Sequence, residues 1–144
     1  MSGRINHLVF GIDPRHLSFY RDLLDHLGWK TIYDSTAVEG EQLFFGAVCP
    51  GDPNTSLWLG SRAKDVANDY DGPGMNHLAF SVDSVAEVDA AAAWLRERGI
   101  AALFDTPRHR PEFAQSSDRT YYQVMFETPD RILLEIVYIG PFSG

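Results

Sequence analysis

The chain has 144 residues, of which 44% are hydrophobic and 22% charged, and 12 basic against 20 acidic residues give a formal net charge of −8. This composition is that of a folded globular domain and excludes a disordered chain. The acidic balance, with no run of Lys or Arg, argues against nucleic acid as a partner, and the single cysteine, Cys49, excludes an intrachain disulfide.

We predict one domain over residues 1–144, because a chain of this length buries about two thirds of the surface that its unfolded form exposes. No apolar stretch is long enough to cross a bilayer, and no apolar signal segment precedes the first predicted strand. We therefore expect a cytoplasmic protein that has no nucleic-acid or membrane partner.

The sequence contains an internal repeat. Residues 6–13, Asn-His-Leu-Val-Phe-Gly-Ile-Asp, recur as residues 76–83, Asn-His-Leu-Ala-Phe-Ser-Val-Asp, and residues 27–34 resemble residues 98–105 more weakly. Arrays of short repeats usually need at least three copies to be stable. Two long copies therefore predict one pseudo-symmetric domain, with modules at about 4–62 and 74–140.

Taken in chain order, the first module begins with a short alternating segment that predicts a strand. Pro14 then suits the first turn of a helix, whose apolar positions recur at helical spacing until Gly28. Three strands are predicted after this helix, at about residues 30–35, 42–48 and 56–60.

The second module repeats this order. Its helix is predicted at residues 85–98, with Ser84 or Asp83 as the cap and Gly99 at the end. The strands that follow it are predicted at about residues 101–105, 120–127 and 132–139. The fold class is therefore α+β, with two tandem βαβββ modules.

Two longer segments separate the predicted elements. Residues 61–74 are polar and rich in turn formers, which is typical of a linker. Residues 106–119 form a long predicted loop, which we interpret as a lid over a binding site, with disorder as the competing interpretation. Within this loop we expect His109 and Arg110 to lie on the solvated surface; the alternative is that they close over an anionic or phenolic group.

Three residues point to metal binding. Because side chains alternate along a strand, His7 and His77 lie opposite the apolar residues that follow them, and the pseudo-symmetry brings their faces together in one cavity. Glu135 is a lone carboxylate in an apolar strand, and a divalent cation is one of the few partners that favour a buried carboxylate. Each residue alone could instead be hydrogen-bonded or exposed. Together they predict a three-ligand site for Fe, Mn, Zn, Ni or Co.

Other residues are candidates for substrate contacts. If Met125 faces the cavity, Tyr121 and Gln123 face it too, and they offer a phenol for proton transfer and an amide for orienting the substrate. Trp58 and Phe113 can stack on an aromatic or apolar ligand, and core packing is the alternative for Trp58. We predict Tyr121 as catalytic and the other four as substrate-binding.

The sequence resembles the vicinal oxygen chelate superfamily, which includes glyoxalase I, extradiol dioxygenases, fosfomycin-resistance enzymes and bleomycin-binding proteins. The resemblance covers nearly the whole chain. It rests on the strand with His7, on Phe-Tyr-Arg-Asp-Leu-Leu at 19–24, on Asn-His-Leu-Ala-Phe at 76–80, and on Phe-Glu-Thr-Pro-Asp-Arg-Ile-Leu-Leu-Glu at 126–135.

This resemblance implies two βαβββ modules whose curved mixed sheets enclose one cavity, with metal ligands at His7, His77 and Glu135. Trp58 stands where glyoxalase I has a fourth ligand, and Met125 stands where extradiol enzymes have a catalytic tyrosine. Family members often form dimers, so a homodimer is expected from the resemblance.

The resemblance implies a divalent-metal-dependent enzyme that binds a small oxygenated molecule through two neighbouring oxygens, with lyase, isomerase or oxygenase chemistry. The alternative function is a binding protein without turnover, such as an antibiotic-sequestering resistance protein.

Overall fold

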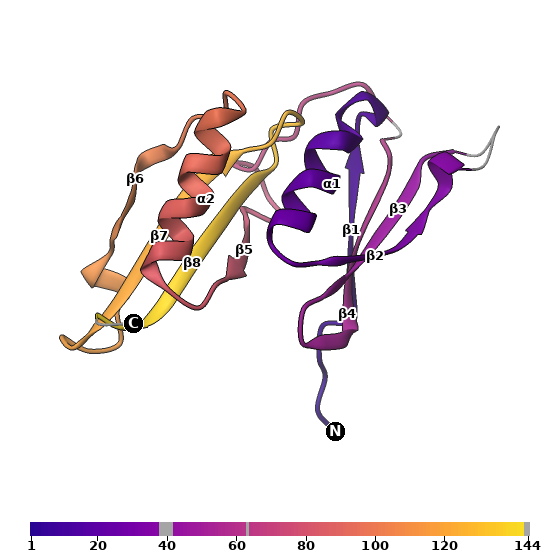
Figure 1. Cartoon of the computed structure of the whole chain (residues 1–144). Coiled ribbons are helices and arrows are strands. Elements are labelled where there is room, and N and C mark those ends of the chain that lie inside the picture. The colour runs from indigo at the N-terminus through magenta and orange to yellow at the C-terminus, as the bar shows by residue number, and fades with distance from the viewer. Residues whose placement is uncertain (38–41, 63, 143–144) are drawn as a thin grey trace. The chain divides into compact units, whose positions relative to one another are not determined.

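The structure is a computed structural model that describes residues 1–37, 42–62 and 64–142. The chain divides into two compact units, Met1–Ala67 and Asn68–Gly144, and each is described by itself. Each unit has one α-helix and one mixed four-stranded sheet (Figure 1). Neither α-helix of the described residues has the length and the apolar run that a membrane crossing needs.

In the first unit, the strands follow the spatial order β1-β4-β3-β2. β1 runs parallel to β4, and the other neighbouring strands are antiparallel. Its elements are β1 (His7–Ile12), the 3-10 turn η1 (Pro14–His16), α1 (Leu17–His26), β2 (Lys30–Asp34), η2 (Ser35–Ala37), β3 (Phe44–Cys49) and β4 (Asp52–Ser61).

The second unit has the same plan, in the order β5-β8-β7-β6 with β5 parallel to β8. Its elements are β5 (Leu78–Ser81), α2 (Val85–Glu97), β6 (Leu103–His109), the 3-10 turn η3 (Pro111–Phe113), β7 (Arg119–Glu127) and β8 (Leu133–Pro141). The prediction of an α+β fold with two tandem βαβββ modules is therefore confirmed.

Local sequence signals fix where the helices begin and end. The hydroxyl of Ser84 accepts a hydrogen bond from the backbone of Glu87, and the Glu87 carboxylate accepts one from the backbone of Asp83 at 2.7 Å. The first contact satisfies an N–H group that the first turn of a helix leaves unpaired, and the second holds the residue before the cap. Gly28 and Gly99 follow the two helices with φ of 77° and 74°, a conformation that glycine adopts without steric cost.

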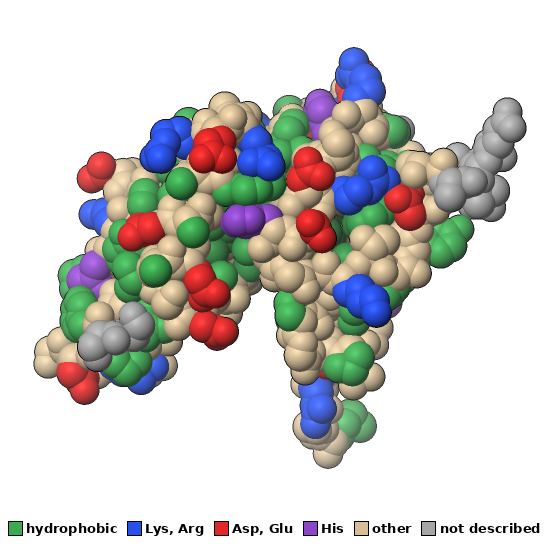
Figure 2. All heavy atoms as spheres, viewed as in Figure 1, with side chains coloured by type: hydrophobic (Ala, Val, Ile, Leu, Met, Phe, Trp, Pro, Cys, Tyr) green, Lys and Arg blue, Asp and Glu red, His purple; other side chains and the backbone are tan. Residues whose placement is uncertain are grey.

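Side chains alternate between two faces of each sheet, as the sequence predicts. Phe10 and Ile12 of β1 and Leu57 and Leu59 of β4 are buried in the core. His7 and the other alternate residues of these strands point to the opposite side, which we name the open face. Exposed apolar and charged side chains are interspersed over both units (Figure 2).

The prediction of a loop over residues 106–119 is wrong for residues 106–109, because β6 continues through His109. The 3-10 turn η3 follows this strand. Pro107 favoured a loop at the sequence level. However, β6 lies at the edge of its sheet, and its register with β7 shifts between Leu103 and Arg108. An irregular edge strand accommodates a proline because it does not need every N–H for pairing. The residues between β6 and β7 are therefore fewer than predicted.

Candidate functional site

Glu135 is the third residue of β8, and only 1% of its surface is exposed. It is paired in register with Ala79 of β5 and Met125 of β7. The Tyr121 hydroxyl donates a hydrogen bond to Oε1 of Glu135 at 2.7 Å. In the amide orientation that satisfies both of its ends, Gln123 also donates to Oε1, at 2.8 Å. Both donors therefore bind Oε1 of this carboxylate, and neither of them binds Oε2.

The second oxygen of Glu135 faces His77. Oε2 lies 3.0 Å from Nε2 of the imidazole. The other ring nitrogen, Nδ1, lies 2.7 Å from Oδ1 of Asn76, and Nδ2 of Asn76 donates to the backbone oxygen of Tyr70 at 3.0 Å. Because the Asn76 amide nitrogen is used as a donor, its oxygen accepts a hydrogen bond from Nδ1–H of His77. A neutral His77 therefore presents a lone pair at Nε2 toward the carboxylate.

This arrangement fits a divalent cation. Two acceptors that face each other repel unless a proton or a cation lies at them. Ligands bound at about 2.0–2.1 Å and at right angles around one metal ion stand about 2.9 Å apart, close to the observed 3.0 Å between Nε2 and Oε2.

The first unit repeats half of this arrangement. Nδ1 of His7 lies 2.7 Å from Oδ1 of Asn6, whose Nδ2 donates to the backbone oxygen of Asn54 at 3.2 Å. This amide orientation likewise leaves Nε2 of His7 as the nitrogen for a ligand. Within residues 1–37, 42–62 and 64–142, no three His, Cys, Asp or Glu side chains gather closely enough to hold a metal ion. The meeting of His7 with His77 and Glu135 therefore stays a prediction.

A pocket of about 480 Å³ lies over His77 and Glu135 in the second unit. Four of the predicted contact residues line it, namely Phe113, Tyr121, Gln123 and Met125. Burial and the hydrogen bond to Glu135 raise the pKa of the Tyr121 phenol well above its usual value of 10. This phenol therefore remains protonated at neutral pH and can serve as a hydrogen-bond or proton donor, but not as a base.

Trp58 lies in the first unit. β1 and β4 pair Val9 with Trp58, just as β5 and β8 pair Ala79 with Glu135, so Trp58 occupies the position equivalent to Glu135. Its ring packs against Phe44 and Tyr33, with centroids 5.3 and 6.1 Å away. The open face of this sheet is thus aromatic where the other sheet carries a carboxylate.

Sequence reasoning missed part of the site. Arg110, which we expected on the solvated surface, lines the pocket, and so do Tyr70, Asn76 and Phe104. A signal for Asn76 was present, because an asparagine precedes the histidine in both copies of the repeat. The sequence offered a binding position for Arg110 only as the alternative, because its placement depends on the pairing of β6 with β7.

The sequence model of the Glyoxalase/Bleomycin resistance protein/Dioxygenase superfamily matches residues 4–136. The chain belongs to this superfamily. Among curated proteins, it is 39% identical over 64 residues to the uncharacterized protein YqjT of Bacillus subtilis. That alignment covers 44% of this chain and 46% of YqjT, so the chain spans about half the length of this relative.

Solved structures of the Glyoxalase/Bleomycin resistance protein/Dioxygenase superfamily share the fold. A candidate glyoxalase from Bacillus halodurans is 25% identical with a TM-score of 0.73, and the match covers 94% of this chain and 96% of that one. The fosfomycin resistance protein FosX of Listeria monocytogenes, in complex with Mn(II) and 1S,2S-dihydroxypropylphosphonic acid, is 16% identical with a TM-score of 0.62, over 99% and 95% of the two chains. The likeness to FosX shows the fold alone.

Proposed function

We propose that this protein is a divalent-metal-dependent enzyme that acts on a small oxygenated molecule. In this proposal His77 and Glu135 supply two metal ligands and His7 supplies the third. The observation that carries the proposal is the contact of 3.0 Å between Nε2 of His77 and Oε2 of Glu135, while Nδ1 of His77 is hydrogen-bonded to Asn76. Bound there, a divalent cation of the Fe, Mn, Zn, Ni or Co group would supply Lewis acidity to neighbouring oxygens of a substrate.

The other residues of the pocket hold the carboxylate and the substrate. Tyr121 and Gln123 both donate to Oε1 of Glu135, which keeps Oε2 directed toward His77. Because its pKa is raised, Tyr121 keeps its proton on Oη, where the hydrogen bond to Oε1 of Glu135 uses it. To donate this proton to a substrate oxygen, the hydroxyl would have to turn away from Glu135. Phe113 and Met125 give the pocket an apolar wall for the body of the substrate.

The proposal is tested by the metal content of protein purified without a tag. Elemental analysis should find close to one equivalent of a divalent metal after reconstitution, and His77→Ala and Glu135→Gln should each remove most of it. His26→Ala, which changes an exposed histidine of α1, is the matched control and should bind metal like the wild type. A wild type that cannot be loaded with any of the five metals would refute the enzyme proposal.

The metal found also narrows the reaction. Iron together with oxygen consumption on catechols would favour oxygenase chemistry, whereas nickel or zinc with turnover of 2-oxo compounds would favour isomerase or lyase chemistry.

A binding protein without turnover is the second candidate. The observation that favours it is the aromatic cluster of Tyr33, Phe44 and Trp58 in the first unit, where Trp58 stands at the position equivalent to that of Glu135 in the second unit. Aromatic side chains suit the recognition of flat apolar ligands. Tight ligand binding without metal, with quenching of fluorescence that is lost in Trp58→Leu, would support this candidate over the first.

A further inference from the structure

We infer that the pocket of the second unit selects ligands with an anionic group, and that Arg110 is the residue that binds this group. The inference rests on the proposed function, because it names the substrate class of the same pocket. The ligand class is a small apolar or aromatic carboxylate, with its body against Phe113 and its charged end at Arg110.

The position of Arg110 is fixed by the backbone on both sides. Arg110 follows the last residue of β6 and precedes η3, and its backbone N–H donates to the backbone oxygen of Tyr121 in β7 at 2.7 Å. The side chain lines the pocket and is 18% exposed. Its guanidinium lies over the ring of Phe113, with 4.8 Å between Cζ and the ring centroid. Arg110 is therefore a mostly buried residue with a fixed position in the pocket wall.

The hydrogen bonds of Arg110 leave part of the guanidinium for a ligand. Nε donates to Oε1 of Glu112 at 2.6 Å, on the side where Glu112 is half exposed. Nη1 lies 3.2 Å from the side-chain oxygen of Gln123. Among the described residues Nη2 has no partner within hydrogen-bond distance. Because the planar guanidinium carries five N–H groups in a fixed fork, two neighbouring donors can bind both oxygens of one carboxylate.

Charge and shape favour an amphipathic anion. Arg110 is the one Lys or Arg among the described residues that line the pocket. The acidic residues of the lining are Asp71 and Glu135, and Oε1 of Glu135 already accepts hydrogen bonds from Tyr121 and Gln123. Phe113 contacts Arg110 and also Tyr121, and the ring centroids of Phe113 and Tyr121 are 5.5 Å apart. An apolar ligand therefore lies beside aromatic rings while its anionic end meets the guanidinium.

The test compares two probes that differ in charge and little in shape, trans-cinnamate and cinnamamide. Their dissociation constants are measured by calorimetry on protein treated with EDTA, so that no metal competes for the carboxylate. The variants are Arg110→Gln, Arg110→Lys and, as the matched control, Arg96→Gln, which removes one positive charge from the exposed side of α2. Circular dichroism checks that each variant is folded.

Wild type and Arg96→Gln should bind cinnamate about tenfold more tightly than cinnamamide, which is the size expected for a charge-assisted hydrogen-bonded pair. In Arg110→Gln the ratio should fall to about one. If that variant does not fold, Arg110→Lys should lower the ratio at least about threefold, because an ammonium lacks the planar fork. Equal binding of the two probes by the wild type, no binding of either, or an unchanged ratio in the Arg110 variants would overturn the inference.

The outcome is independent of the metal measurement. A preference for cinnamate that depends on Arg110, in a protein that takes up no metal, would support the inference and refute the proposed enzyme. A protein that binds metal but shows no preference for cinnamate would refute the inference and support the proposed enzyme.

Discussion

At the level of single residues, the hydrogen bonds of Asn76 determine which nitrogen of His77 faces the pocket. The amide bridges Nδ1 of His77 and the backbone oxygen of Tyr70, so it orients the ring and fixes the tautomer at the same time. Partners of this kind commonly contribute to metal affinity without touching the metal. Asn6 has the same relation to His7, which makes the two asparagines equivalent parts of the proposed site.

We predict that Asn76→Ala weakens metal binding about 10-fold to 100-fold, because Nδ1 loses the acceptor that holds the ring. Asn76→Asp should retain most of the affinity, because a carboxylate also accepts from Nδ1. A competition titration with a metal-binding dye measures both. Asn68→Ala, which removes a similar bond from a side chain to the backbone oxygen of Arg131, is the control. Equal affinities for wild type and Asn76→Ala would show that the asparagine has no role in positioning.

Gly46 leaves room for the ring of Trp58. A Cβ added at Gly46 would lie 2.6 Å from two atoms of that ring, which is closer than packed atoms can approach. We predict that Gly46→Ala displaces the indole and lowers the free energy of unfolding by about 1–3 kcal/mol, the usual cost of overpacking. Urea denaturation followed by tryptophan fluorescence measures this. Gly60→Ala, whose Cβ would meet Phe44 at an ordinary 3.7 Å, should change stability little; equal effects would contradict the packing argument.

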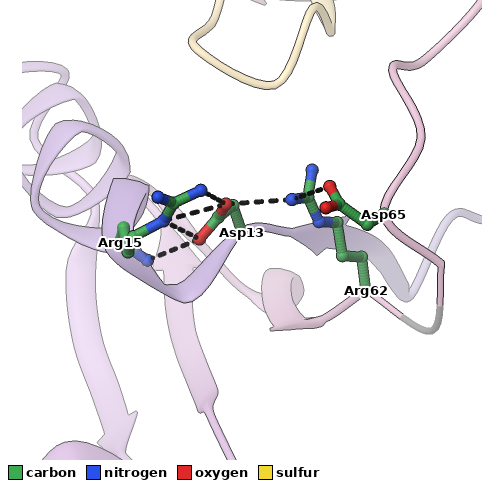
Figure 3. Close-up of polar contacts among 4 residues, drawn as sticks. All are labelled: Asp13, Arg15, Arg62 and Asp65. Carbon is green, nitrogen blue, oxygen red and sulfur yellow. Dashed lines mark hydrogen bonds and ion pairs between the residues drawn. The ribbon is translucent and has the colours of Figure 1, made fainter.

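At the level of elements, Asp13 joins the end of β1 to the end of β4. Its carboxylate is 2.7 Å from Nη2 of Arg15 and 2.9 Å from Nη2 of Arg62, and Arg62 also pairs with the exposed Asp65 (Figure 3). The side chain and backbone of Arg15, followed by the charge of Arg62, hold the pKa of Asp13 well below its usual value of 3.8. These contacts secure the parallel pair that carries His7 and Trp58.

We predict that Asp13→Asn lowers the thermal unfolding midpoint at pH 7. Because the folded state depresses the pKa of Asp13, its contribution is complete above the ordinary value of 3.8 and is lost as the pH falls below it. The difference between wild type and variant should therefore shrink on acidification. Calorimetry at pH 7 and below pH 3.8 checks this, with Asp65→Asn as the control because the Asp65 side chain is 91% exposed. A difference that does not depend on pH would argue against the charged contact.

At the level of the whole molecule, the repeat in the sequence predicted the fold, because two copies of one hydrophobic pattern specify two copies of one module. Alternation along the strands placed Leu8 and Phe10 opposite His7, and the register of β4 with β1 makes Trp58 the counterpart of Glu135. The capping residue Ser84 and the glycines after both helices also lie where their local signals predicted.

The rest depended on packing between elements distant in sequence. The extension of β6 past Pro107 follows from its edge position, which a single proline does not reveal. The inward placement of Arg110 follows from the pairing of β6 with β7 and from its contact with Phe113. The short-range sequence pattern contains neither fact, since both require knowing which strands are neighbours.

The two units have diverged at equivalent positions. Both keep the Asn-His pair, but the second has Glu135 and a pocket, whereas the first has Trp58 and an aromatic open face. A homodimer and a cytoplasmic location remain predictions. The proposed three-ligand site therefore depends on whether His7 of the first unit binds the same metal ion as His77 and Glu135.

The most direct test is a crystal structure of the protein soaked with Mn(II), with anomalous scattering recorded to locate the metal. Our account predicts one strong anomalous peak bound by Nε2 of His77, Oε2 of Glu135 and Nε2 of His7. A structure that shows no peak beside His77 and Glu135, or that shows their direct contact of 3.0 Å kept as an ion pair in the presence of excess metal, would contradict it.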